Sequence, residues 1–399
     1  MRTIILIFRG ELTGGAKESE IRGRYWPIVT DLPIAHHRLR NQRLTGPPFE
    51  KPEQVVRWLT AVQSQDYAGA KWAIAQRVKQ VADDEIDKLF NAGRILRTHV
   101  MRPTWHFVTP ADIRWLLMLT APRVNAANGH YYRKLELDDT VFNRTNKAIA
   151  KALSGGRQLT RGALRAAVQR AGVATDHAAD DLLRFNYILI RAELDGVICS
   201  GARQGKQFTY ALLDERVPET KPRLRDQALA DLTRRYFTSH GPATLPDFVW
   251  WSGLTAKDAN SGLGMVQSHL LKEVIDGKAY WRSSSVPSAK RATRVAYLLP
   301  VFDEYLVSYK DRSAAFEAND SKETPGGNMM LGPVIVIGGR VVGSWKRSLE
   351  GNRVCITLNH FAAVSKSESQ LVADAANRYG EFLGTTLVQR LGNTWILFV

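Results

Sequence analysis

Between residues 140 and 215 the apolar positions follow first the period of helices and then that of strands. Three helical segments come first, at 143–153, 161–172 and 178–196. Two short β-type runs follow within 197–213, around a turn rich in glycine and basic residues. Three short helices followed by a hairpin are typical of a winged helix, which places Arg203 and Lys206 at the tip of the wing.

The same order of segments recurs at about 223–285. Thr244 and Thr255 stand before helical segments there as N-caps, and Asp276–Gly277 is a strong two-residue hairpin turn. A less regular copy occupies about 36–125. The pattern therefore predicts three tandem winged helices rather than one large domain.

The first copy contains a helical pattern over 52–65 and a hairpin over 95–108, whose turn is expected near Arg102–Pro103. A further helix follows, with Thr109 as its cap and Pro110 at its first position. This copy therefore contains a hairpin as the others do, with one more helix after it.

Residues 292–399 differ from the three copies. Strand-like runs, a hairpin turn at Gly338–Gly339 and a helix over 367–384 predict a β-rich domain, with 394–399 as a last strand. The expected fold class is α+β, with three winged helices and a C-terminal α+β domain. The expected domains are a mobile tail at 1–35, winged helices at 36–139, 140–222 and 223–291, and the last domain at 292–399.

The net charge of the chain indicates which class of partner the protein binds. Its 55 Lys and Arg residues against 39 Asp and Glu give a net charge of +16 and a pI near 9.9. Such an excess suggests a polyanionic partner such as DNA or RNA, and on composition alone a basic surface kept for solubility or for ribosome-type contacts stays equally open. Cys199 and Cys355 are too few for a disulfide framework, and no apolar run reaches the ~18 residues of a membrane span. We expect a cytoplasmic, nucleoid-associated protein that needs no membrane.

Four segments carry a resemblance to a known family: 61–77, 96–112, 298–313 and 338–347. In this order they resemble the AlkZ-like bacterial DNA glycosylases, over about residues 36–399. The resemblance implies tandem winged helices in a concave arrangement that cradles double-stranded DNA. It also implies hydrolysis of the glycosidic bond of N7-alkylated purines, in some members including interstrand cross-links made by natural-product genotoxins.

The family's catalytic motif is Gln-x-Gln or Gln-x-Asp, and Gln63-Ser64-Gln65 matches the first form. The resemblance therefore makes Gln63 and Gln65 the catalytic candidates. Spacing alone favours the plainer interpretation, two polar residues at a helix end. Residues at i and i+2 point the same way only in extended backbone, so the hypothesis predicts that the helix from Pro52 loosens around Gln63.

The chemistry is consistent with a site that lacks a carboxylate. Glycosidic cleavage passes through an oxocarbenium-like sugar, which glycosylases commonly stabilise with Asp or Glu. A glutamine cannot act as a base, but its carbonyl can hold a water. An N7-alkylated purine already carries a positive charge and departs as a neutral base. Gln63 would orient water towards C1′, with Gln65 in support, and undamaged purines would stay untouched.

The first hairpin supplies further candidates for DNA binding. Arg97 and Arg102 would hold phosphates, while Trp105 and His106 would approach the lesion or sugar. The alternative is that Trp105 belongs to the core and His106 is a half-buried, satisfied histidine. Arg203 and Lys206 would contact phosphate if the second wing reaches the duplex, and a solvated turn explains them equally well.

Asp303 and Glu304 are the rival catalytic carboxylates. They lie in one of the resembling segments, but the resemblance assigns them no catalytic role. The alternation of apolar residues around them predicts a strand at a domain junction, with Lys310 or Arg312 as ion-pair partner. Loss of cleavage in Asp303→Asn alone would overturn the glutamine pair.

No sequence motif points to a cofactor or a metal. There is no Walker A loop, dinucleotide fingerprint or metalloprotease helix, and His99 and His106 lack acidic partners at ligand spacing. We expect a monofunctional, metal-free, monomeric enzyme. The rival function is a winged-helix transcriptional regulator, which would hold one preferred sequence and release no base. RNA binding is weaker still, because no aromatic RNP-type strand is present.

Overall fold

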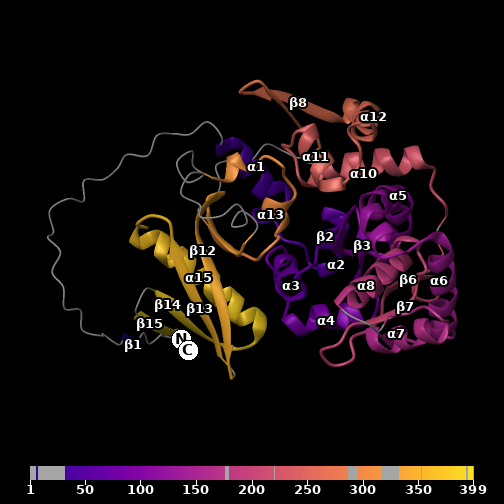
Figure 1. The fold of residues 1–399 in the computed structure, drawn as a ribbon. Coiled ribbons are helices and arrows are strands. Elements are labelled where there is room, and N and C mark those ends of the chain that lie inside the picture. Colours follow the sequence, from indigo (N-terminus) through magenta and orange to yellow (C-terminus); the bar gives the residue numbers. More distant parts are fainter. Residues whose placement is uncertain are drawn as a thin grey trace. The chain divides into compact units, whose positions relative to one another are not determined.

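The computed structural model describes residues 6–7, 32–175, 179–219, 221–285, 295–316, 332–351, 353–391 and 394–398. The chain forms two compact units (Figure 1). We call them the helical unit, Asn41–Pro287 with Phe302–Lys310, and the sheet unit, Met1–Arg40 with Ser288–Val301 and Asp311–Val399. Residues 302–310 were expected in the C-terminal domain, and the structure instead assigns them to the helical unit.

Three successive parts of the helical unit share one order of elements. The first consists of α2 (Pro52–Leu59), β2 (Val62–Gln63), α3 (Tyr67–Ala75), α4 (Asp83–Asn91), β3 (Leu96–Val100) and β4 (Arg102–Val108). Its three-stranded sheet has the order β2-β4-β3. The hairpin turns at Met101, whose φ of 65° is left-handed.

The second part repeats this order with different lengths. It consists of α6 (Asp139–Leu153), β5 (Leu159–Thr160), α7 (Arg161–Arg170), α8 (Ala179–Leu194), β6 (Ile198–Ser200) and β7 (Thr209–Leu212). Its sheet order, β5-β7-β6, matches that of the first part. The long helix α5 (Pro110–Lys134) joins the two parts and begins after Thr109 with Pro at its first turn, as expected. A short helix, α9 (Leu213–Arg216), follows β7.

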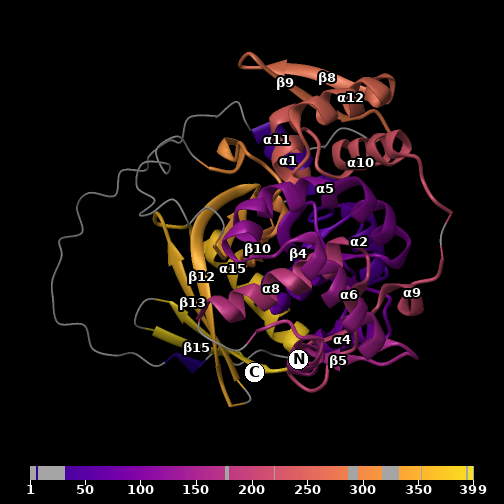
Figure 2. The same cartoon turned by 45° about the vertical axis from the view of Figure 1, so that its right-hand side comes forward.

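The third part replaces the short first strand with a single bridge. It consists of α10 (Arg225–Ser239), α11 (Leu245–Ser252), α12 (Ala256–Val266), a 3₁₀ turn (Gln267–His269), β8 (Leu270–Ile275) and β9 (Lys278–Ser283). Ala243 and Trp281 exchange two backbone hydrogen bonds of 3.0 and 2.8 Å, where the other parts have a strand. The β8–β9 hairpin, which turns at Asp276–Gly277, projects beyond α11 and α12 (Figure 2).

Local sequence explains the starts of these helices. The hydroxyls of Thr160, Thr244 and Thr255 each accept a hydrogen bond from the N–H three residues later. Such caps satisfy N–H groups that the helix itself leaves without partners. One apolar core packs α5 against α10 and α11, and a second fills the α6–α8 part. In the described residues no helix has both the length and the apolar character of a membrane span.

The sheet unit is built on one mixed sheet of seven strands. Its order is β1 (Leu6–Ile7), β15 (Thr394–Phe398), β14 (Thr386–Leu391), β13 (Arg353–His360), β12 (Arg340–Glu350), β11 (Val334–Ile337) and β10 (Ala296–Leu299). Only β13 and β14 pair in parallel, because α15 (Lys366–Leu383) makes the crossover between them. The expected Gly338–Gly339 turn joins β11 and β12, with φ values of 56° and 89°.

The expected tail at 1–35 is described only in part. Leu6–Ile7 pairs with β15, and α1 (Leu32–Asn41) begins inside the expected tail. Residues 1–5 and 8–31 lie outside the described residues. An apolar start adds a strand to the edge of the sheet, a long-range pairing that the local pattern does not reveal.

Candidate active site

The Gln-x-Gln segment begins in extended backbone. Helix α2 ends at Leu59, because Thr60 adopts a left-handed φ of 73°. Gln63 then pairs with His106 of β4, and the Ser64 N–H donates to the Trp105 carbonyl at 2.8 Å. The prediction of a helix over 52–65 was therefore wrong after Leu59. The extended backbone that was expected at Gln63 is confirmed. The strand ends at Gln63, and the chain bends at Gln65, directly before α3.

The two glutamines differ in exposure. Gln63 is only 6% exposed, whereas Gln65 is exposed. The Gln63 N–H donates to Glu304 Oε1 at 2.8 Å, and Gln63 Oε1 accepts from the Gln65 N–H at 3.2 Å. A carbonyl oxygen accepts two hydrogen bonds, so Gln63 Oε1 keeps one lone pair for another donor. The motif thus combines one fixed and one solvent-facing amide.

Arg97 of β3 holds the same segment from another side. Its Nε and Nη2 both donate to the Ser64 carbonyl, at 3.2 and 3.1 Å, and the residue is 8% exposed. The guanidinium lies 4.3 Å from the ring centroid of Trp105 and 4.7 Å from that of Phe208. Burial lowers the pKa of Arg97 from its ordinary value. Arg97 thus contacts the motif itself rather than solvent.

The other candidates of the first hairpin lie on β4, the strand that pairs with β2. Trp105 is half-buried and packs on His99, whose Nδ1 is hydrogen-bonded to Glu193. Arg102 is half-buried, with its guanidinium 5.9 Å from the Trp250 ring centroid.

His106 is fully buried. Its Nδ1 lies 2.9 Å from the Thr104 carbonyl oxygen, and its Nε2 has no hydrogen-bond partner within the described part of the chain. Burial, and then the nearby charge of Arg102, lower the pKa of His106 to about 3. The ring is therefore neutral at physiological pH.

The turn between β6 and β7 reaches the first part of the helical unit. Arg203 forms an ion pair with Asp87 at 3.3 Å, and its guanidinium lies 5.1 Å from the Tyr67 centroid. Tyr67 begins α3 two residues after Gln65. Lys206 is exposed at the tip of the turn. Arg203 therefore belongs to the surroundings of the motif, whereas Lys206 faces solvent.

Asp303 and Glu304 were expected on a strand, but they lie at the start of a short helix. Asp303 caps a short helix, α13 (Glu304–Val307), by accepting from the Tyr305 N–H at 2.9 Å. Its ion-pair partner is Arg77 rather than Lys310 or Arg312, with two bonds of 2.8 and 2.9 Å and both side chains buried. The strand prediction was wrong because a helical turn that is buried on all sides has the same apolar composition as a buried strand.

Glu304 was expected to be structural, and no pattern in the sequence indicated its contact with Gln63. Besides the Gln63 N–H, its carboxylate accepts from Trp251 Nε1 at 3.2 Å and from the Ser308 hydroxyl, and it lies 3.7 Å from His240 Nε2. Burial alone would raise its pKa, but nearby His240 and the hydrogen bonds from the Ser308 hydroxyl and the Gln63 N–H lower it to about 2. The buried carboxylate is thus ionised. The one available signal was an acidic pair inside an apolar run.

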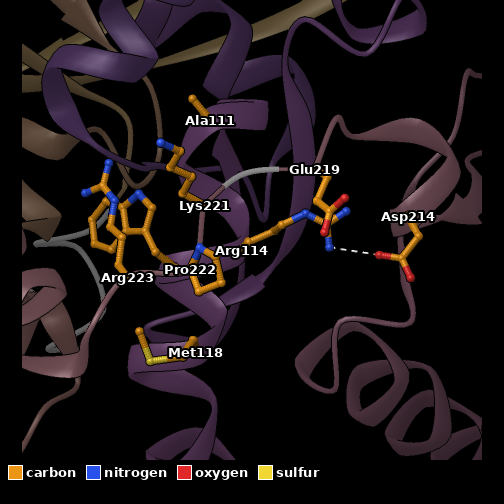
Figure 3. A pocket seen from close by; sticks show the side chains of 9 residues that line it. Ala111, Arg114, Met118, Asp214, Glu219, Lys221, Pro222 and Arg223 are labelled. Carbon is orange, nitrogen blue, oxygen red and sulfur yellow. Dashed lines mark hydrogen bonds and ion pairs between the residues drawn. The ribbon is translucent and has the colours of Figure 1, made fainter.

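Two hollows of the helical unit contain no residue of the motif. One, of about 900 Å³, is lined by Ala111, Arg114, Trp115, Met118, Asp214, Glu219, Lys221, Pro222 and Arg223 (Figure 3). Arg114 and Asp214 form an ion pair of 2.8 Å across its rim. The other, of about 550 Å³, shares Ala111 and Arg223 with it. The candidate site therefore rests on the contacts of the motif and not on these hollows.

Known proteins are similar to this chain in sequence and in fold. A solved structure, DNA glycosylase AlkZ of Streptomyces sahachiroi, is similar with a TM-score of 0.73 and 20% identity, over 89% of this chain and 96% of that one. An interstrand DNA cross-link repair glycosylase of the same organism is 23% identical over 327 residues, which cover 77% of this chain and 85% of that protein. The family model described as DNA glycosylase AlkZ-like matches residues 56–382. Because this match spans most of the sequence, the chain belongs to the AlkZ-like family of DNA glycosylases.

Proposed function

We propose that this DNA glycosylase hydrolyses the N-glycosidic bond of N7-alkylated purines in double-stranded DNA, with water positioned by Gln63 and Gln65. Interstrand cross-links joined through such purines belong to the proposed substrates. The name of the Streptomyces sahachiroi relative, a cross-link repair glycosylase, supports this extension. The enzyme leaves an abasic site and needs neither a cofactor nor a metal.

The observation that carries the proposal is the fixed geometry of the motif. Gln63 is held through its own N–H by Glu304, and Ser64 through its carbonyl by Arg97. The remaining lone pair of Gln63 Oε1 accepts a hydrogen bond from the attacking water, while exposed Gln65 supports the water or the sugar. Two neutral amides suffice because the alkylated base is already cationic and departs as a neutral molecule. Normal purines lack that charge and stay bound.

We further propose that the three repeated parts are winged helices in a concave arrangement. Their shared element order and the matching sheet orders of the first two parts support this assignment. Lys206 and Arg102 would contact phosphates, and Trp105 and His106 would line the lesion side of the motif. Arg97 and Arg203 would position the motif and its neighbours, because their guanidinium groups already engage Ser64 and Asp87.

The test is base release from defined duplexes. Duplexes that carry 7-methylguanine or a nitrogen-mustard cross-link are incubated with the wild type, Gln63→Ala and Gln65→Ala under single-turnover conditions. We expect each variant to lower the excision rate by about 100-fold, the scale for removal of one preorganised polar group. Gln370→Ala, an exposed glutamine of α15, is the matched control and keeps the wild-type rate. Release of undamaged purines at a comparable rate would contradict the mechanism.

A further inference from the structure

We propose that Glu304 is a positioning residue, whose buried carboxylate fixes the backbone of Gln63 and thereby the aim of its amide at the attacking water. The inference rests on the proposed function of the Gln-x-Gln motif and adds to it a residue 241 positions away in the sequence. Glu304 touches neither the water nor the sugar in this scheme. It acts only through Gln63.

The contacts of Glu304 explain why a carboxylate stands there. The Gln63 N–H, the Trp251 Nε1–H and the Ser308 hydroxyl all point hydrogens at it. An ionised carboxylate is acceptor-only and has lone pairs for all three, whereas an amide would turn its own NH₂ towards one of the donors. Charge-assisted hydrogen bonds are also shorter and stronger than neutral ones. The Gln63 N–H is therefore held more rigidly than an ordinary strand pairing would hold it.

The segment that carries Glu304 is itself anchored in the helical unit. Asp303 forms a bidentate pair with Arg77, and Arg77 also donates to the Gln42 carbonyl at 2.9 Å. Gln42 Nε2 in turn donates to the Glu304 carbonyl at 3.0 Å. Because Asp303 neutralises Arg77, Glu304 keeps its negative charge for its own donors. These bonds thus fix the position of Glu304 relative to β2.

The first experiment compares Glu304→Gln with Asp112→Asn as matched control. Asp112 is equally a buried carboxylate that accepts from a Trp Nε1–H, that of Trp115 at 3.0 Å, and pairs with Arg235. None of its partners belongs to the motif. Single-turnover excision of 7-methylguanine and equilibrium binding of the same duplex are measured. We expect Glu304→Gln to lower the rate at least 10-fold with the dissociation constant unchanged within twofold, and Asp112→Asn to leave both unchanged.

The second experiment separates positioning from loss of structure. In a Gln63→Ala background, Glu304→Gln is expected to lower the residual rate less than twofold, because both substitutions remove the same function. A full further loss would overturn the positioning role. Should Glu304→Gln not fold, Ser308→Ala removes one donor and keeps the carboxylate, and Glu304→Asp keeps the charge on a shorter arm. Wild-type rates in both of these variants would overturn the inference.

These outcomes also distinguish the two proposals. If the wild type releases alkylated bases and Gln63→Ala does not, but Glu304→Gln excises normally, only the positioning role fails. If the wild type releases no alkylated base, the proposed substrate class fails.

Discussion

At the residue scale, the buried polar groups around the motif decide its chemistry. His106 stands beside Gln63 in the strand pairing and is fully buried. The pattern left open whether it contacts a lesion or is a satisfied core histidine. Its Nδ1 has a partner, whereas no hydrogen-bond partner of Nε2 occurs among the described residues. A neutral ring in this place leaves the charge of the site to the arginines and Glu304.

The lowered pKa of His106 has a consequence for stability. Its folded pKa is about 3, against an ordinary value of 6.5. Between these values the unfolded chain binds a proton that the folded chain excludes, so the free energy of unfolding falls as the pH falls from 6.5 towards 3. We expect His106→Asn to flatten this slope by about 1 kcal/mol per pH unit between pH 6 and 4.5, in urea unfolding at several pH values. His130→Asn, an exposed histidine of α5, should keep the wild-type slope; equal slopes in all three proteins would refute the assignment.

At the scale of the elements, helix ends fix how neighbouring parts approach. Gly253 ends α11 with a φ of 68°, and a Cβ there would lie 2.2 Å from the Met101 carbonyl oxygen. Met101 is the turn between β3 and β4, next to Arg102. The end of α11 therefore packs directly on the hairpin that carries the candidate residues. A glycine allows this approach through both its left-handed φ and its missing side chain.

Alanine substitutions at two glycines separate these effects. Gly253→Ala adds a methyl group against backbone in a strained conformation, so we expect a loss of at least about 2 kcal/mol in the free energy of unfolding. Gly264 lies inside α12 with open space around it, and Gly264→Ala should gain about 0.5–1 kcal/mol. Chemical unfolding of the three proteins measures both. A neutral Gly253→Ala would mean that α11 and the hairpin approach less closely.

At the scale of the whole molecule, charge and family membership agree on the partner. A net charge of +16 suits a phosphate backbone, and the family match identifies a DNA glycosylase. Several of the basic side chains are engaged within the protein itself. Arg77, Arg97 and Arg203 form ion pairs or hydrogen bonds with other protein groups. We expect the exposed remainder to supply the attraction to DNA.

The difference between exposed and internally bound basic side chains predicts the salt dependence of DNA binding. The logarithm of the association constant for an undamaged duplex should fall linearly with the logarithm of salt concentration, because bound counterions are released. Lys206→Gln should reduce the slope by about one unit. Arg97→Gln should leave the slope unchanged and lower only the excision rate, because its guanidinium binds Ser64. Equal slopes for wild type and Lys206→Gln would show that the turn between β6 and β7 does not contact DNA.

The sequence by itself determined the local features of this protein. Threonine caps, the Asp276–Gly277 and Gly338–Gly339 turns and the repeated order of helices and hairpins were all predicted, because each depends on hydrogen bonds and dihedral angles within a few residues. The glutamine pair came from its resemblance to a family motif, and its extended backbone followed from the spacing that the chemistry requires.

Only the tertiary structure decided what surrounds that pair. Glu304 meets Gln63 across 241 residues, and Asp303 meets Arg77 across 226, in preference to the nearby Lys310. Burial of a charge costs desolvation free energy, so the charge needs a partner at the place where packing buries it. Distance along the chain does not decide which residue that partner is. The local pattern around residues 303–307 therefore predicted a strand, whereas burial and two long-range partners formed a helical turn that holds the motif.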